Sequence, residues 1–206
     1  MWSVANTLPR DAHLEMEDAK QIMRDSVRAH RTERSDRERR EAAESIAVHA
    51  TELLVGVQCV ATYAARRSEP DTAPLMDVLD RAGISILLPM LGPGLSRDWA
   101  RYRPGDPLEV RAPGRPPDPE GPGLGAEALA EADLILTPAL SVDAAGNRLG
   151  QGGGWYDRAL AHARPDARVI AILFDDEVST EPLPVAAHDR RVDGVLTPKG
   201  LILAAE

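Results

Sequence analysis

Four short apolar runs, separated by helical or turn segments, most strongly limit the folds open to this chain. They occupy residues 57–64, 84–91, 133–140 and 168–174, and a weaker run follows at 193–198. The runs are continuously apolar rather than alternating, which is typical of strands that are covered on both faces. A mostly parallel sheet flanked by helices covers its strands in this way. The pattern therefore predicts an α/β protein.

Two helices are expected before the first strand. The first is predicted to begin near Glu17, with Ile22, Met23 and Val27 as a narrow buried stripe. Its basic residues recur at spacings of three and four and so share a face: Lys20, Arg24, Arg28 and Arg31. Ser35 followed by Glu38 is the pattern of a capping box, which predicts the start of the second helix. Later helices are expected near residues 75–79 and 156–164.

The length of 206 residues is sufficient for one well-filled core and short for two, so a single domain is expected over residues 17–206. Residues 1–16 show no clear period and predict a flexible tail. Between residues 92 and 125, proline and glycine interrupt helices and strand pairing. This excursion fits a functional lid and a disordered segment equally well. A short strand around residues 108–110 is the regular element expected within it.

Composition excludes several classes of partner. The formal net charge of −9 argues against a general nucleic-acid binder, which needs clustered lysine and arginine. No apolar stretch approaches the roughly 20 residues of a membrane span, and the N-terminus lacks the pattern of a signal peptide. Cys59 is the single cysteine and is expected to be a buried core residue. We expect a cytoplasmic protein without a membrane partner and, since there is no coiled-coil seam, a monomer.

The run NRLGQGGGWYD, residues 147–157, is the first candidate site. Its glycines are expected to let backbone N–H groups converge on an anion at the start of the following helix. The spacing matches neither the dinucleotide nor the Walker pattern, and a tight strand-to-helix connection explains the glycines alone equally well. Arg148 adds a cation and Asp157 a carboxylate suited to Mg²⁺. Asp189, in a later loop, is a second candidate ligand or else an exposed loop acid.

Four elements in order resemble the 5-formyltetrahydrofolate cyclo-ligase family, whose members are also called 5,10-methenyltetrahydrofolate synthetases. They are the K-x-x-x-R pair of Lys20 and Arg24, the SEPDT element at 68–72, GNRLGQGGGWYDRAL at 146–160, and LPVAAHDRRVDGVLTP at 183–198. The resemblance spans about Lys20 to Pro198. It implies a three-layer Rossmann-like fold related to ribose-5-phosphate isomerase and the coenzyme A transferases. It also implies Mg²⁺-dependent conversion of 5-formyltetrahydrofolate and ATP to 5,10-methenyltetrahydrofolate, ADP and phosphate.

The resemblance also implies residue roles. Lys20 and Arg148 would be catalytic. The ATP-binding set would be Lys20, Arg24, Arg148, Leu149, Gly150, Gln151, Gly152, Gly153, Gly154, Trp155 and Tyr156. The folate, which relatives can take in polyglutamylated form, would contact Glu69, Gln151, Gly152, Gly153, Gly154 and Trp155. Asp157 and Asp189 would hold Mg²⁺. Without the other motifs, Lys20 and Arg24 would be read as a solvated helix face, and Glu69 as an acid at a helix N-terminus.

This chain departs from the family pattern at three positions. Gln151 and Gly153 stand where some relatives carry a basic residue, and Trp155 replaces the more usual tyrosine. These changes leave open an alternative from another class, a nucleotide- or folate-binding module without catalysis. A third hypothesis is a different small kinase-like or ligase reaction on a related acyl amide.

Overall fold

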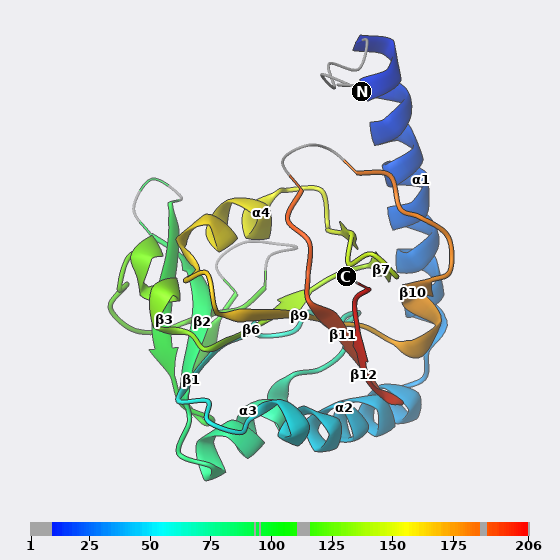
Figure 1. Ribbon diagram of the computed structural model, residues 1–206. Coiled ribbons are helices and arrows are strands. Elements are labelled where there is room, and N and C mark those ends of the chain that lie inside the picture. Colours follow the sequence, from blue (N-terminus) through cyan, green and yellow to red (C-terminus); the bar gives the residue numbers. More distant parts are fainter. Residues whose placement is uncertain (1–9, 93, 95, 111–115, 186–188, 206) are drawn as a thin grey trace.

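The computed structural model describes residues 10–92, 94, 96–110, 116–185 and 189–205, with the backbone alone described for residues 10–14. Within these ranges the centre is a seven-stranded sheet with the order β12-β11-β9-β6-β1-β2-β3 (Figure 1). Its inner strands run parallel, whereas β12 and β3 pair antiparallel at the edges. The predicted mostly parallel α/β sheet is confirmed. In chain order, the strands are β1 (Cys59–Ala61), β2 (Ser85–Leu91), β3 (Arg97–Tyr102), β6 (Leu134–Pro138), β9 (Arg168–Ile172), β11 (Gly194–Thr197) and β12 (Gly200–Leu203).

The sheet is covered on both faces, as the continuous apolar runs predict. In β6, Leu134 and Leu136 belong to one core cluster, and Ile135 between them belongs to the other. Burying each such side chain stabilises the fold by roughly 1.5–3 kcal/mol. The first cluster is closed by α2 (Asp36–Ala50), η1 (Thr51–Leu53) and α3 (Ala73–Arg81). The second is closed by η3 (Ala126–Glu131), α4 (Trp155–Ala159) and η4 (Leu160–His162).

The first helix, α1, spans Arg10–Glu33 and differs from the prediction in two respects. It begins before Glu17, so residues 10–16 are helical, and only residues 1–9 of the expected tail lie outside the described residues. Ile22 is 71% exposed and is not part of a buried stripe. Met23 and Val27 do pack, on the small cluster of Leu140, Leu149 and Leu183. The prediction about Ile22 was wrong because the inward face of α1 is largely charged, so apolar periodicity does not locate it.

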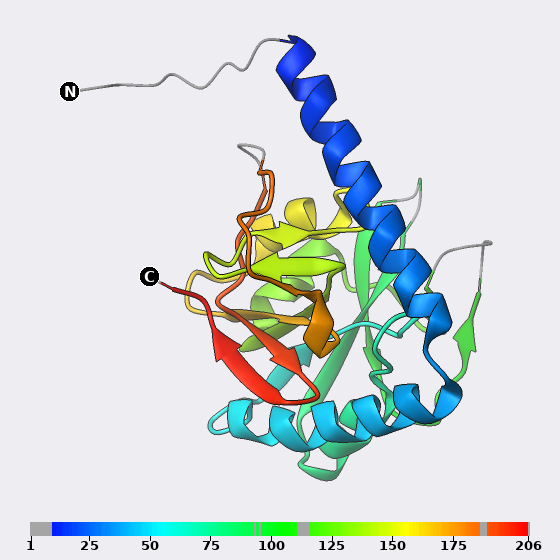
Figure 2. The same ribbon diagram turned by 90° about the vertical axis from the view of Figure 1, so that its right-hand side faces the viewer.

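The N-terminal half of α1 projects beyond the sheet and its helices (Figures 1 and 2). Within the described ranges, neither α1 nor any other helix is long and apolar enough to cross a lipid bilayer. The corner between α1 and α2 is held by Arg39, which donates to the carbonyl oxygens of Arg31 and Arg34 at 2.8 and 2.9 Å. The predicted capping box is confirmed, with Glu38 N donating to Ser35 Oγ at 3.2 Å and Ser35 N to Glu38 Oε2 at 2.7 Å.

The Pro/Gly-rich segment contains a strand that the sequence reading did not predict. β3 pairs with β2 over six residues, from Ile86 with Tyr102 to Leu91 with Arg97. Trp99 on β3 is almost fully buried, so this part is neither a lid nor a disordered excursion. The expected short strand is confirmed as β4 (Leu108–Glu109), which pairs with β5 (Asp118–Pro119). Residues 111–115 lie outside the described part of the chain.

A second, three-stranded sheet includes the two strands that precede the glycine-rich run. It consists of β10 (Val178–Ser179), β7 (Ser141–Asp143) and β8 (Arg148–Leu149). The turn between β7 and β8 is stabilised by the Asp143 carboxylate, which accepts from Ala145 N at 3.0 Å and Asn147 N at 2.9 Å. The sequence reading treated residues 141–147 as a strand followed by a turn. The hairpin and its return strand position Arg148 and the start of the glycine-rich run.

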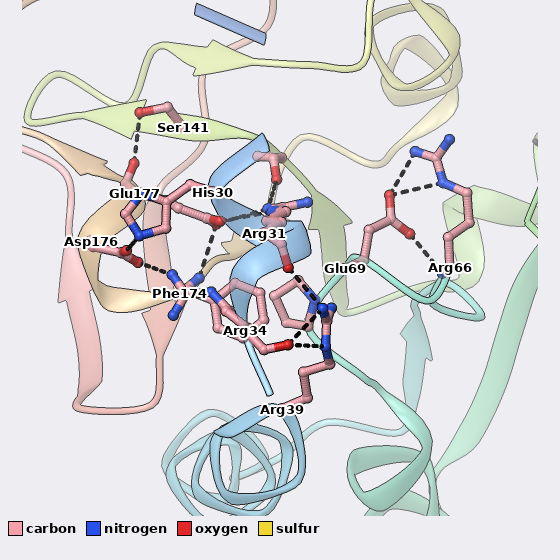
Figure 3. A network of polar contacts seen from close by, with 12 residues as sticks. His30, Arg31, Arg34, Arg39, Arg66, Glu69, Ser141, Phe174, Asp176 and Glu177 are labelled. Atoms are coloured by element: carbon pink, nitrogen blue, oxygen red, sulfur yellow. Dashed lines mark hydrogen bonds and ion pairs between the residues drawn. The ribbon is translucent and has the colours of Figure 1, made fainter. Parts of the chain in front are cut away.

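A buried ion pair attaches the C-terminal part of α1 to the body. Arg31 donates to both carboxylate oxygens of Glu177, in η5 (Asp175–Glu177), at 2.7 Å each, and to the carbonyl oxygen of Ala139 at 2.7 Å (Figure 3). Burial alone would lower the pKa of Arg31, but the hydrogen bond and charge of Glu177 outweigh it and raise that pKa. Both side chains are at most 5% exposed. The pair therefore remains charged and fixes the base of the helix.

Replacing Arg31 with alanine is expected to lower the free energy of unfolding by about 3–5 kcal/mol, because Glu177 would remain buried and unpaired. The matched control is Arg37→Ala, which removes an exposed pair with Glu41 and should leave stability nearly unchanged. Urea denaturation of the two variants and the parent measures the difference. Equal losses in both variants would contradict the role given to the buried pair.

Candidate functional site

A cavity of about 320 Å³ opens at the carboxyl ends of the parallel strands, where ligands of open α/β sheets usually bind. Its walls come from α1, from the segment after β1, from the end of β2 and from the glycine-rich run. Every residue that the sequence reading assigned to the site lines this cavity: Lys20, Arg24, Glu69, Arg148, Leu149, Gly150, Gln151, Gly152, Gly153, Gly154, Trp155, Tyr156, Asp157 and Asp189. Their individual roles remain predictions.

α1 contributes a basic wall whose charges are held by distant residues. Lys20 is 5% exposed and Arg24 is 7% exposed. The Lys20 Nζ atom lies 2.7 Å from Asp189 Oδ2, and Arg24 Nε donates to the Gly150 carbonyl at 3.1 Å. Glu17 lies 3.7 Å from the Arg24 guanidinium. These two residues are therefore not the solvated helix face that the helix alone would suggest.

The glycine-rich run is shaped by two glycines with positive φ, Gly152 at 101° and Gly154 at 57°, which other residues rarely adopt. Arginines on both sides bind its carbonyl groups. Arg28 donates to the Gln151 carbonyl at 3.0 Å and Arg158 to the Gly153 carbonyl at 2.6 Å. With its carbonyls bound in this way, the run can turn N–H groups toward an anion in the cavity.

Arg148 and Tyr156 each carry a buried polar atom that forms no hydrogen bond with a described residue. Arg148 pairs with Asp157 at 2.7 Å, yet its buried Nε has no hydrogen-bond partner among the described residues. The buried Tyr156 hydroxyl likewise has none there. Burial raises the pKa of Tyr156 well above its usual value, and the charge of Glu69 raises it further, so the hydroxyl stays protonated. Buried polar atoms of this kind are costly unless something in the cavity pairs with them.

Glu69 is buried and held in a defined orientation. Its carboxylate accepts from the backbone N of Arg66 at 2.9 Å and from the Arg66 guanidinium at 2.7 Å (Figure 3). Gln151 Nε2 donates to it at 3.2 Å, while Gln151 Oε1 accepts from Arg28 at 3.2 Å. Gln151, one of the departures from the family pattern, therefore joins α1 to the segment after β1.

Two tryptophans meet beside the cavity. The rings of Trp99 and Trp155 are 5.3 Å apart in an edge contact, and Trp155 lies 4.9 Å from Tyr156 in the same manner. Trp155 lines the cavity, together with Met90 and Leu91 at the end of β2. These residues give the cavity an aromatic and apolar part in addition to its charged wall.

Several lining residues were missed from the sequence. Arg66 lies three residues before Glu69, a spacing that is a weak signal for an ion pair. Tyr63 and residues 89–91 were recognised as strand ends but not as site residues, although ligands usually bind where parallel strands end. Asp118 comes from the Pro/Gly-rich segment, which carried no interpretable pattern.

The expected metal ligands are present in the cavity but do not form a ready-made cluster. Asp189 pairs with Lys20 and Asp157 with Arg148. The described residues contain no group of three or more His, Cys, Asp or Glu side chains placed to hold a metal ion. A Mg²⁺ site is therefore not established by the protein residues alone.

The fold and the cavity together are those of an α/β enzyme whose candidate site is built on a glycine-rich run, paired cations and a buried carboxylate. The chain belongs to the 5-formyltetrahydrofolate cyclo-ligase family, whose model matches residues 16–198. It is 43% identical over 157 residues to the 5-formyltetrahydrofolate cyclo-ligase of Mycolicibacterium smegmatis, covering 74% of this chain and 79% of that protein. The Escherichia coli K12 enzyme of the same name is 30% identical, with 70% and 80% covered.

Solved structures agree. The 5,10-methenyltetrahydrofolate synthetase of Aquifex aeolicus superposes with a TM-score of 0.75 at 28% identity, covering 91% of this chain and 93% of that chain. The Mycoplasma pneumoniae synthetase gives 0.68 at 16% identity, over 87% and 98% of the two chains, and this likeness supports the fold alone. The family resemblance read from the motifs and the expected fold are both confirmed.

The shape of the glycine-rich run can be tested by a matched pair of substitutions. Gly152→Ala places a side chain at a φ of 101° and should lower the free energy of unfolding by roughly 1–3 kcal/mol, or shift the run, because that conformation is strained. Gly153→Ala is the control, since its φ is not positive and its added Cβ would meet nothing within 4 Å. Thermal and urea unfolding compare them. A Gly153→Ala variant as destabilised as Gly152→Ala would refute the positive-φ requirement.

Proposed function

We propose that this protein catalyses the ATP-dependent cyclisation of 5-formyltetrahydrofolate to 5,10-methenyltetrahydrofolate, with release of ADP and phosphate. The observation that most supports the proposal is the convergence of Lys20, Arg24, Glu69, Arg148 and the glycine-rich run on one cavity. Family membership supports the cyclo-ligase activity. We further expect the enzyme to act as a monomer in the cytoplasm.

The chemistry divides between phosphoryl transfer and ring closure. The formyl oxygen attacks the γ-phosphorus of ATP, the bond to the bridging oxygen breaks, and ADP leaves. N10 then attacks the activated formyl carbon, the phosphate departs with the former formyl oxygen, and N10 loses its proton. The carbon is thereby joined to both N5 and N10. Phosphoryl transfer depends mainly on positioning and on stabilising charge.

The residues of the cavity suit these tasks. Lys20, Arg24 and Arg148 supply fixed positive charge for the phosphate oxygens, and Arg148 has a buried Nε without a partner among the described residues. The N–H groups of the glycine-rich run add neutral donors. Glu69, held by Arg66 and Gln151, is a rigid acceptor for N–H groups of the pterin. Trp155 offers a flat surface for a heterocycle.

Mg²⁺ is the metal that we propose for this reaction, held by Asp157 and Asp189. The fit is reasonable because both carboxylates line the same cavity, and Mg²⁺ in nucleotide sites commonly takes one or two carboxylates together with phosphate oxygens. When bound, the ion would neutralise negative charge on the phosphates. Lys20 and Arg148 already lie against these carboxylates and would share them with it.

The proposal is tested by incubating purified protein with 5-formyltetrahydrofolate, ATP and Mg²⁺. We expect the methenyl chromophore to appear with one ADP per product, and neither to form when ATP is omitted. Absence of product in a sensitive assay would refute the proposed activity. Tight binding of both ligands without turnover would instead support the binding-module alternative, and turnover of another acyl amide in preference to this folate would support the third hypothesis.

Asp157→Asn and Asp189→Asn should each raise the Mg²⁺ concentration that gives half-maximal rate by roughly tenfold or more, since each removes a charged oxygen ligand. Asp176→Asn is the control, because Asp176 pairs with Arg34 and His30 and does not line the cavity. Initial rates across a Mg²⁺ titration measure the effect. An unchanged Mg²⁺ requirement in both site variants would refute the metal assignment and leave the two acids as partners of Lys20 and Arg148.

A further inference from the structure

We propose that Arg97 and Arg158 form a binding site for the carboxylates of the glutamyl end of the folate substrate. The inference rests on the proposed function and adds a second anchor for the same substrate. The pair lies beside the cavity, where strand β3 and helix α4 approach each other. No role was assigned to either residue from the sequence.

The position of the pair follows from its neighbours. Arg97 pairs in register with Leu91, and Arg158 donates to the Gly153 carbonyl at 2.6 Å. Leu91 and Gly153 both line the cavity. Arg97 is two residues from Trp99 on the same face of β3, and the Trp99 ring contacts Trp155 of the cavity wall at 5.3 Å. Figure 1 shows α4 beside the ends of β2 and β3 that lie nearest the site.

The ion pairs of the cavity distinguish basic side chains that already contact a protein carboxylate from arginines that do not. The basic side chains that line it each lie against a protein carboxylate: Lys20 with Asp189, Arg24 with Glu17, Arg66 with Glu69, and Arg148 with Asp157. By contrast, neither Arg97 nor Arg158 has an ion pair with a described carboxylate. The protein has 33 acidic residues and 24 lysines and arginines. Two arginines without an ion pair to a described carboxylate are therefore unusual in this chain.

The environment of Arg97 is unfavourable for its charged guanidinium group. Its Nε atom is buried and has no hydrogen-bond partner among the described residues. Burial lowers the pKa of the Arg97 guanidinium, and the nearby positive charge of Arg158 lowers it further. An anion between the two side chains would relieve the repulsion and satisfy the buried donor. Arginine is well suited to this task because its planar group binds a carboxylate through two parallel hydrogen bonds.

The spacing of the strands matches an elongated ligand that begins at Glu69. Glu69 follows β1, whereas Arg97 begins β3, and β2 lies between them. Neighbouring strands are about 4.8 Å apart, so the two ends of such a ligand would lie roughly 10 Å or more apart across the sheet. Met90 and Leu91, at the end of β2, lie between them, and Trp155 of α4 lines the same cavity. With its pterin at Glu69, a folate would lay its aromatic middle on this apolar strip and direct its glutamyl carboxylates to the arginines.

A substrate-truncation experiment tests the pair. The variants Arg97→Ala, Arg158→Ala and the double variant are assayed with 5-formyltetrahydrofolate and with 5-formyltetrahydropteroate, which lacks the glutamyl group. Each single substitution should raise KM for the glutamyl substrate about tenfold relative to the truncated substrate, the effect of losing one charge-assisted hydrogen bond. For the truncated substrate, Arg97→Ala should match the parent. Arg158→Ala also loses the hydrogen bond to the Gly153 carbonyl, so it is judged by the ratio of its KM values for the two substrates. The difference should shrink as salt is added, because Arg158 is exposed.

The control variant is Arg37→Ala, which removes an exposed arginine of α2 and should leave KM for both substrates unchanged. Equal losses for the two substrates in the arginine variants would overturn the proposal, as would a rise in KM for ATP in place of folate, which would assign the pair to the nucleotide. If Arg97→Ala does not fold, the ratio of KM values for the two substrates in Arg158→Ala decides the matter, because loss of the hydrogen bond to Gly153 affects both substrates alike.

The outcome is separable from that of the proposed function. If the parent protein turns over neither substrate, the proposed function fails, and equilibrium binding of the same two compounds to parent and variants then tests the pair directly. Tighter binding of the glutamyl compound that is lost in Arg158→Ala would support it. Identical affinities of the parent protein for the two compounds would overturn it.

Discussion

The ion pair between Arg31 and Glu177 is the interaction on which the cavity depends. Few apolar side chains attach α1 to the body, with Met23 and Val27 on a small cluster, and half of the helix projects away from the sheet. The buried, bidentate ion pair therefore contributes to the attachment of α1. Because it joins two pairs of atoms, it restrains both the position of the helix and its rotation about its axis. Arg31 lies about three turns after Lys20 and about two turns after Arg24 on the same face of the helix. Its pairing with Glu177 therefore also directs Lys20 and Arg24 toward the cavity.

Ion pairing between protein side chains also extends through the candidate site. Each cation of the cavity wall lies against a carboxylate of the protein, so the lining is close to locally neutral despite its many ionised groups. For the proposed reaction, incoming phosphates would compete with Asp157, Asp189 and Glu17 for these cations, and a divalent ion would compensate the displaced carboxylates. Binding of nucleotide and metal would thus be coupled through the protein's own ion pairs. The same ion pairs also reduce the repulsion between the positive side chains before substrate binds.

Sequence reasoning located most of this site and failed in instructive places. The glycine-rich run, Glu69 and Asp189 were identified from motifs, and the parallel sheet from continuous apolar runs, because both signals are local. β3 was missed, since the glycines and prolines around it hide a strand whose pairing partner is β2. Ile22 was misplaced because α1 turns a charged face inward. The pairing of Asp189 with Lys20 joins residues 169 positions apart, so the local sequence could not predict it. The lack of a described carboxylate beside Arg97 also depends on the tertiary structure.

The partner of Arg31 lies 146 residues further along the chain, and that separation has a consequence for how the protein is made. During synthesis α1 leaves the ribosome before the strands of the sheet, and Glu177 emerges only when most of those strands have been translated. Until Glu177 has been made, the ion pair with Arg31 cannot form, although β1, β2 and β6 have already been translated. The wall that α1 contributes to the cavity can therefore be fixed by this ion pair only after most of the domain has been made.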